Sequence, residues 1–179
     1  MASLRYCRFD TPIGRCGIAW TEAGIARVQL PEPDDRRAVG RLERGGATES
    51  APPPAVAEAI AVIARHLGGE PQDFSGVTLD LGGAGDFARR VYAAAWAVPP
   101  GRTVTYGEIA ATIGEPKEAR AVGQALGANP IPLIVPCHRV VASNGGIGGF
   151  SAPGGSMTKT RLLALEGVGL PLDWSPSAR

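Results

Sequence analysis

Three short runs of alternating apolar and polar residues occupy the start of the chain. They predict β-strands over residues 6–9, 16–20 and 26–30. Turns that contain glycine separate the runs, so we expect an antiparallel meander. Residues 77–81 are a candidate for one more strand that joins this sheet.

Five later segments have apolar residues at the spacing of one helix face. They lie at residues 55–67, 87–97, 105–113, 117–126 and 157–166. The cap of the second segment is Asp86, and Thr105 with Glu108 forms a capping box for the third. Ser156 or Thr158 is the expected cap of the last segment. Residues 31–54 are rich in Pro, Gly, Arg and Glu, and we interpret them as a long, mobile surface connection.

The glycine run at residues 82–85 predicts a boundary between an α/β domain at 1–82 and a mainly helical domain at 83–179. In the second domain, two short helices joined by a glycine-containing turn predict a helix-turn-helix. The second of these helices is unusually small-sided around Gly123, a residue that costs about 1 kcal/mol in a helix relative to Ala. Two explanations stay open: tight packing on a neighbouring helix, or close approach to a nucleic-acid groove.

Composition narrows the class of protein only modestly. Hydrophobic residues make up 44% of 179 residues, enough for a core, and no apolar run approaches the length of a membrane span. Three cysteines without a CxxC pair indicate reduced thiols and, with no secretory leader at the N-terminus, a cytoplasmic protein. The basic excess lies in the second half, which carries nine basic and six acidic residues, as expected if that half meets an anion.

The composition of residues 129–141, NPIPLIVPCHRVV, indicates a nucleophile that a stiff segment of the chain holds in place. Three prolines stiffen an apolar approach that ends in Cys137-His138-Arg139. Cysteine reacts as its thiolate, and a nearby histidine lowers the pKa of the thiol. In an extended chain, neighbouring side chains point to opposite faces, so contact between Cys137 and His138 needs a tight turn or a bridging water.

Two other side chains bear on this site. Glu166 lies at the C-terminal end of a predicted helix, where a carboxylate opposes the helix dipole and needs a positive partner. Either solvent or His138 fills that role; with His138, the three residues form a nucleophile, a base and an orienting group. His66, near the end of another predicted helix, is expected to be a surface or cap residue. Cys7 and Cys16 are expected to be buried strand residues without a metal.

The motif VPCHRVV, preceded by Asn129-Pro130, resembles the active-site signature of the O6-alkylguanine-DNA alkyltransferases, also called methylated-DNA–protein-cysteine methyltransferases. The similarity extends over residues 86–167. It implies a ribonuclease-H-like N-terminal domain and a winged-helix-like C-terminal domain, with double-stranded DNA carrying O6-alkylguanine as the partner. It also implies no cofactor, no membrane and a monomer in solution. Some relatives carry a zinc in the N-terminal domain, but the cysteines and His66 of this chain do not match that spacing, so no metal is expected.

The resemblance assigns roles by position. Cys137 accepts the alkyl group, His138 activates it through a water, Glu166 orients His138, Asn129 holds the turn, and Tyr106 hydrogen-bonds the flipped guanine. Expected DNA contacts come from the two short helices and the active-site strand, at Arg120, Ala119, Gly123, Thr105 and Arg139. The expected walls of the base pocket are Val140, Phe150, Ser151 and Gly149.

Two departures from the family pattern concern the pocket. Phe150 stands where the family usually has Tyr, and the loop after Ser151 is longer, reading APGG rather than GG. The main rival function is a non-catalytic alkyltransferase-like protein that senses damage, although such relatives lack the cysteine that this chain has as Cys137. A Cys-His hydrolase would turn over, and a helix-turn-helix regulator would show strong sequence preference.

Overall fold

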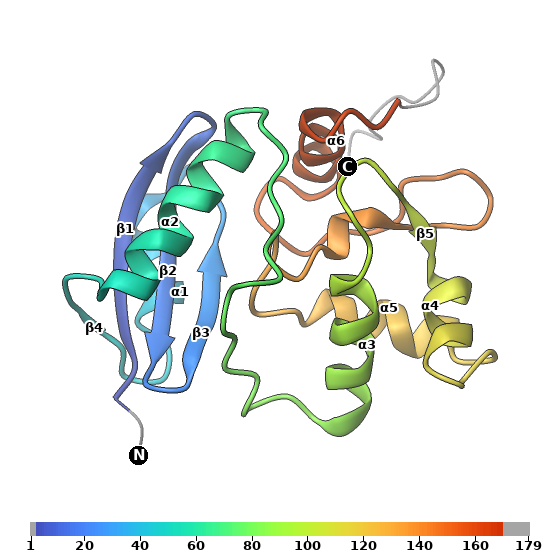
Figure 1. The fold of residues 1–179 in the computed structure, drawn as a ribbon, viewed down its shortest axis with the longest axis horizontal. Coiled ribbons are helices and arrows are strands. Elements are labelled where there is room, and N and C mark those ends of the chain that lie inside the picture. Colours follow the sequence, from blue (N-terminus) through green and yellow to red (C-terminus); the bar gives the residue numbers. More distant parts are fainter. Residues whose placement is uncertain (1–2, 170–179) are drawn as a thin grey trace.

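The computed structural model of the protein describes residues 3–169, and its first half is built around a four-stranded sheet (Figure 1). The strands lie in the order β3-β2-β1-β4. Their bounds are β1 Arg5–Thr11, β2 Gly14–Thr21, β3 Gly24–Gln29 and β4 Thr48–Glu49. The predicted meander of β1, β2 and β3 is confirmed as antiparallel. The short β4 pairs with β1 in parallel, which the sequence did not predict.

Two helices cover the two faces of this sheet. They are α1 Asp35–Leu42 and α2 Pro54–Leu67. The central strand β2 is buried on both faces because Ile18 and Trp20 point into the main core while Ala19 packs near Leu42 of α1. The interpretation of residues 31–54 as a mobile connection is wrong: Asp34 caps α1 by accepting from the N–H groups of residues 36 and 37.

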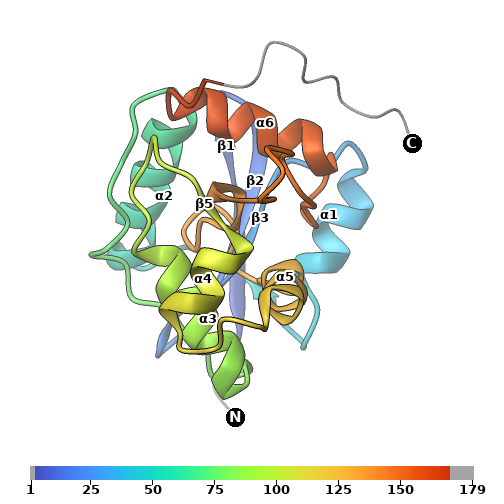
Figure 2. The ribbon, with the colours of Figure 1, turned by 90° about the vertical axis from the view of Figure 1, so that its right-hand side faces the viewer.

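The second half is mainly helical, as predicted (Figures 1 and 2). Its elements are α3 Asp86–Trp96, β5 Val104–Thr105, α4 Tyr106–Thr112, α5 Ala119–Gly127, the 3₁₀ turn η1 Cys137–Arg139, β6 Val140–Val141 and α6 Gly155–Leu165. The capping box of Thr105 and Glu108 is confirmed. The other two predicted caps are wrong, since Gly85 precedes α3 and Gly154, at φ +85°, precedes α6.

Residues 77–81 do not form a strand. They join the sheet by one parallel bridge between Ile25 and Leu79, with the Ile25 N–H donating to the Thr78 carbonyl at 2.9 Å. No helix among residues 3–169 is both long and apolar enough to cross a membrane.

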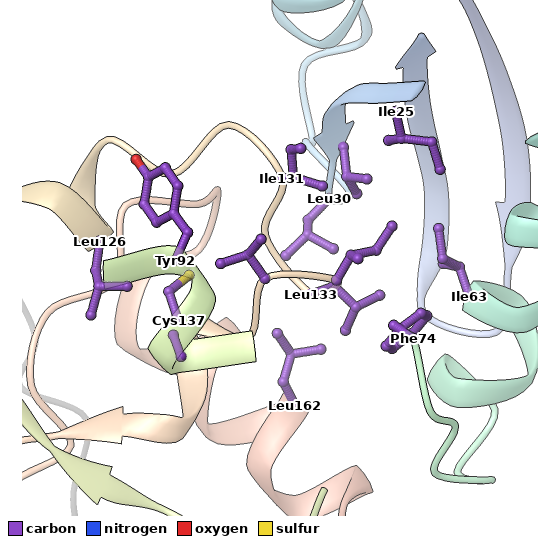
Figure 3. Packing of buried hydrophobic residues seen from close by; sticks show 14 of the residues in the cluster. Ile25, Leu30, Ile63, Phe74, Tyr92, Leu126, Ile131, Leu133, Cys137 and Leu162 are labelled. Atoms are coloured by element: carbon purple, nitrogen blue, oxygen red, sulfur yellow. The ribbon is translucent and has the colours of Figure 1, made fainter. Parts of the chain in front are cut away.

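One hydrophobic core runs through both halves. Figure 3 shows it continuing from Ile63 and Phe74 beside the sheet, through Leu133 and Leu162, to Cys137. The core therefore ties the reactive cysteine to the N-terminal half, although 62 residues lie between Phe74 and Cys137 in the sequence.

Candidate active site

Cys137 begins a single 3₁₀ turn that brings three functional side chains onto one small segment. The turn, η1, contains Cys137, His138 and Arg139, and all three are buried. The extended conformation considered for this segment is therefore wrong, and the tight turn is the arrangement present. Before the turn, Leu133 has φ +76°, a left-handed conformation that is costly for a branched side chain.

Asn129 holds the loop that leads to this turn. Its side-chain nitrogen donates to the Val135 carbonyl at 2.9 Å, and its side-chain oxygen accepts from the Ile131 N–H at 3.0 Å. Both bonds are buried, so the Asn129 side chain satisfies backbone groups of a loop that has no regular ladder. The geometry fits the expected role of Asn129 in holding the turn before Cys137.

Cys137 lies at a cavity of about 290 Å³ on the helical half of the protein. Cys137 is 6% exposed, so a reactant must enter the cavity to reach the thiol. The cavity is lined by Tyr106, Gly123, Leu126, Gly127, Cys137, Gly149, Phe150 and Ser151. A larger cavity, about 680 Å³, lies between the sheet and α2, but no cysteine or histidine of the described residues lines it.

A buried carboxylate organises the base side of the site. Glu166 Oε1 lies 2.7 Å from His138 Nε2, and the Arg139 guanidinium donates to both Glu166 oxygens, at 2.8 and 2.9 Å. Burial alone would raise the pKa of Glu166, but hydrogen bonds from His138, His66 and Arg139 hold that pKa well below its usual range. The carboxylate is therefore ionised, and the alternative of a solvated Glu166 is wrong.

The ionised carboxylate fixes the tautomer of His138. Because Nε2 faces Glu166, it carries the proton, and Nδ1 of the neutral ring is left with a lone pair. Among residues 3–169, no side chain or backbone group hydrogen-bonds to this buried Nδ1. Burial lowers the pKa of His138 despite the opposing effect of Glu166, so the ring is a neutral base at physiological pH.

Two predictions about this network are wrong. His66 is not a surface residue: it is 1% exposed, and its Nε2 lies 2.9 Å from Glu166 Oε1. Arg139 does not face DNA: it is 3% exposed, and its guanidinium binds Glu166 and the Val98 carbonyl. Both errors arise because His66 and Arg139 hydrogen-bond to the buried Glu166, which is distant from each of them in sequence.

Lys159 is a site residue that the sequence reading missed. It is fully buried in α6, and its Nζ donates to the Val140 carbonyl at 2.6 Å and the Gly149 carbonyl at 3.1 Å. The same ammonium lies 5.8 Å from the centre of the Tyr106 ring. Lys159 therefore ties the strand after Cys137 to the glycine loop. The sequence carried no signal for this, because Lys159 stands between Thr158 and Thr160, where a surface lysine would be expected.

Burial and charge act in opposite directions on the nucleophile. Burial raises the pKa of the Cys137 thiol, while a hydrogen bond from Asn129 and the positive charge of Lys159 oppose that rise. Burial lowers the pKa of Lys159 to about 8, against the pull of the Cys137 thiolate. The resting thiol is protonated, so a base must take its proton when it reacts.

Tyr106 reaches the pocket because two distant segments pair. The two-residue strands β5 and β6 are parallel, with Val104 opposite Val140, and this pairing places the start of α4 beside the segment that follows Cys137. The glycine loop also contacts the ring: a Cβ on Gly148 would lie 2.7 Å from the Tyr106 hydroxyl. Burial raises the pKa of Tyr106, as does the nearby Cys137, so its hydroxyl stays a donor.

Of the remaining predicted pocket and DNA residues, some line the cavity and others do not: Gly123, Gly149, Phe150 and Ser151 line it, and Val140, Thr105, Ala119 and Arg120 do not. Phe150 is half-buried and Ser151 is exposed, on the loop that faces α5. Arg120 is exposed in the first turn of α5, and Ala119 and Gly123 are half-buried on the same helix. A Cβ on Gly123 would lie 3.7 Å from the Tyr106 ring, which is ordinary contact, so internal packing does not require a glycine there.

Comparison with known proteins places this geometry in a family. Residues 86–168 match the family model of the 6-O-methylguanine DNA methyltransferase DNA-binding domain. The chain is 39% identical to a methylated-DNA–protein-cysteine methyltransferase of Mycolicibacterium paratuberculosis, covering 91% of this chain and 92% of that one. It is 35% identical to the mouse protein of the same name, over 92% of this chain and 82% of the mouse chain.

Solved structures agree with the sequence comparison. The Mycobacterium tuberculosis OGT in complex with DNA has a TM-score of 0.75 and 38% identity, covering 91% of this chain and 93% of that chain. The O6-methylguanine-DNA methyltransferase of Pyrococcus kodakaraensis has a TM-score of 0.69 and 26% identity, over 92% of this chain and 99% of the archaeal chain. The agreement in sequence and fold extends over nearly the whole chain, so this protein belongs to the methylated-DNA–protein-cysteine methyltransferase family.

Proposed function

We propose that this protein repairs DNA by moving the alkyl group of O6-alkylguanine to its own Cys137, once per molecule. The observation that carries the proposal is the buried thiol at the end of a small cavity, beside a histidine whose tautomer a buried carboxylate fixes. A base inside a duplex cannot reach such a thiol, so the lesion is flipped out of the stack, at a cost of a few kcal/mol.

The transfer is a displacement at a saturated carbon. As the thiol reacts, its proton passes through a water to Nδ1 of His138, and Cys137 Sγ bonds to the alkyl carbon as the carbon–O6 bond breaks. The electron pair of that bond leaves with the guanine, whose developing negative charge is stabilised by a hydrogen bond from Tyr106. The product is a thioether that water does not cleave, which makes the reaction stoichiometric.

For DNA binding, we propose that α4 and α5 form a helix-turn-helix within a winged-helix-like domain, behind a ribonuclease-H-like N-terminal domain. Arg120, exposed at the start of α5, enters the base stack in place of the extruded nucleotide, and the small side chains around Gly123 admit the duplex backbone. Ala119 is the first residue of α5 and Thr105 is the N-cap of α4, so both lie at the N-terminal ends of these helices. We further propose a cytoplasmic monomer with a domain boundary near residue 82.

The pocket walls follow from the same placement. Val140 and the loop from Gly149 to Ser151 border the flipped base, with Phe150 as an aromatic wall that lacks the hydroxyl of the usual Tyr. The non-catalytic alternative is disfavoured because Cys137 occupies the nucleophile position.

The deciding experiment is intact mass after excess protein meets a duplex with one O6-methylguanine. We expect one added methyl group per lesion, mapped to Cys137 and absent from Cys137→Ala. Cys16→Ala is the matched control, because Cys16 is equally buried but lies in the sheet, and it should still gain the methyl group. Tight binding that prefers the lesion, with no mass change, would instead mark a damage sensor.

A further inference from the structure

The carboxylate that orients His138 is held from both halves of the protein. Glu166 Oε1 accepts from His138 and Arg139, which are on η1, and from His66, which is near the end of α2 in the N-terminal half. His66 Nε2 lies 2.9 Å from this oxygen across 100 residues of sequence. This polar contact joins α2 to the end of α6, two helices that pack together.

The surroundings of His66 determine which of its ring nitrogens carries the proton, as Glu166 does for His138. The backbone N–H of Gln72 donates to His66 Nδ1 at 3.0 Å, so Nδ1 carries no proton. The ring proton is therefore on Nε2 and points at Glu166. The ring also packs against Phe74, with centroids 5.1 Å apart, and His66 is 1% exposed. His66 is thus a neutral, directed donor.

We propose that His66 is a positioning residue through which the N-terminal half sets the reactivity of Cys137. This inference rests on the proposed alkyl transfer. Glu166 is the C-cap residue of α6, so its side chain projects from the end of that helix and not from within it. Arg139 and His138 both approach from the same short turn. His66 donates from a separate helix, α2, whose inner face is buried, and it fixes the carboxylate against which the His138 ring is oriented.

Two amide substitutions of similar polarity test the two hydrogen bonds of His66 one at a time. His66→Gln places an amide N–H near the former Nε2 and keeps the bond to Glu166. His66→Asn places an amide oxygen near the former Nδ1, so it keeps the bond from Gln72 and loses the one to Glu166. Leu67→Met is the matched control, because Leu67 is the next residue of α2, is equally buried and does not hydrogen-bond to Glu166.

The measurement is the single-turnover rate of methyl transfer at saturating lesion duplex, with the dissociation constant measured separately. We expect His66→Asn to slow transfer about tenfold, the scale of one hydrogen bond to a charged group. The affinity should stay within about twofold, because His66 is remote from the DNA-facing helices. His66→Gln and Leu67→Met should stay within about threefold of the unaltered protein in rate. Equal rates for the Asn and Gln variants would overturn the proposal.

A second readout separates failure of this inference from failure of the proposed function. Iodoacetamide alkylates a thiol with loss of iodide and a proton, and mass mapping reports the rate at Cys137 without DNA. We expect His66→Asn to react there about tenfold more slowly than His66→Gln at pH 7. This ratio decides the role of His66 even if the unaltered protein transfers no methyl group, and a ratio near one overturns it.

Discussion

At the scale of single residues, the chemistry of this site depends on where protons are held. Glu166 fixes one histidine proton and Gln72 fixes another, so both rings are neutral donors toward a single carboxylate. The lone pair of His138 Nδ1 has no hydrogen-bond partner among the described residues, which suits it to the role of base in the proposed transfer. A buried ammonium, Lys159, supplies the positive charge that favours the thiolate.

Lys159→Met should make Cys137 less acidic. The substitution removes the only cation among the groups that lower the thiol pKa, and it also frees the Gly149 carbonyl from its tie to α6. The apparent pKa in a pH profile of iodoacetamide alkylation at Cys137 should rise, and the rate at pH 7.5 should fall. Lys117→Met, which alters the other lysine of the chain at an exposed turn, should leave the profile unchanged. An unshifted profile in Lys159→Met would contradict this role.

At the scale of elements, the meander, the helices of the second half and one helix cap were predictable from nearby residues, and features set by distant pairing were not. The capping box joins Thr105 to Glu108, three positions apart, and was predicted. The pairing of β5 with β6 involves two residues on each side, too few for a periodic signal, yet it brings Tyr106 to the pocket. The places of His66 and Arg139 were mistaken because their common partner, Glu166, is distant in sequence.

Gly123→Ala should separate stability from repair. An added methyl group meets only ordinary contact with the Tyr106 ring, and alanine is favoured over glycine in a helix by about 1 kcal/mol, so the melting temperature should rise. The same methyl group narrows the mouth of the cavity, so we expect weaker binding of the lesion duplex. Fluorescence anisotropy with lesion and undamaged duplexes measures this, and unchanged binding would show that α5 does not approach DNA at Gly123.

Gly148→Ala is expected to act in the opposite way on the fold. Gly148 has φ +80°, and a Cβ there would lie 2.7 Å from the Tyr106 hydroxyl, so the loop or the ring must move. Both backbone strain and this clash lower the free energy of unfolding, by about 1–2 kcal/mol from the backbone alone. Urea unfolding should show the loss, and methyl transfer should slow. Gly145→Ala, also at positive φ but in open space, is the control that isolates the contact with Tyr106.

At the scale of the whole molecule, the two halves share one core and one ion-pair network. The hydrophobic cluster continues from the sheet to Cys137, and Glu166 joins α2 to η1. Composition and periodicity predicted the order of sheet and helices, because those signals are local. They did not predict that the carboxylate beside His138 lies where the two halves meet. Contacts between residues that are distant in sequence leave no local pattern.

This network predicts a pH dependence of stability. The pKa of Glu166 is lower in the folded protein than in the unfolded chain, so its contribution is present at neutral pH and is lost as the pH falls below about 4.5. The pKa of His138 is also lowered by folding, so below about 6.5 the unfolded chain gains that proton first. Both effects have the same sign, and the melting temperature should fall steadily from pH 7 to pH 4.

Glu166→Gln tests whether the network is the cause. It leaves the buried Arg139 guanidinium without its anion, which should lower the free energy of unfolding at pH 7 by about 3–5 kcal/mol. It also removes the group that titrates below about 4.5, so the melting temperature should depend less steeply on pH below that value. Calorimetry from neutral pH down through this range, with the exposed Glu118→Gln as control, measures both effects. If the melting temperature of the variant kept the pH dependence of the unaltered protein, carboxylates other than Glu166 would govern acid unfolding.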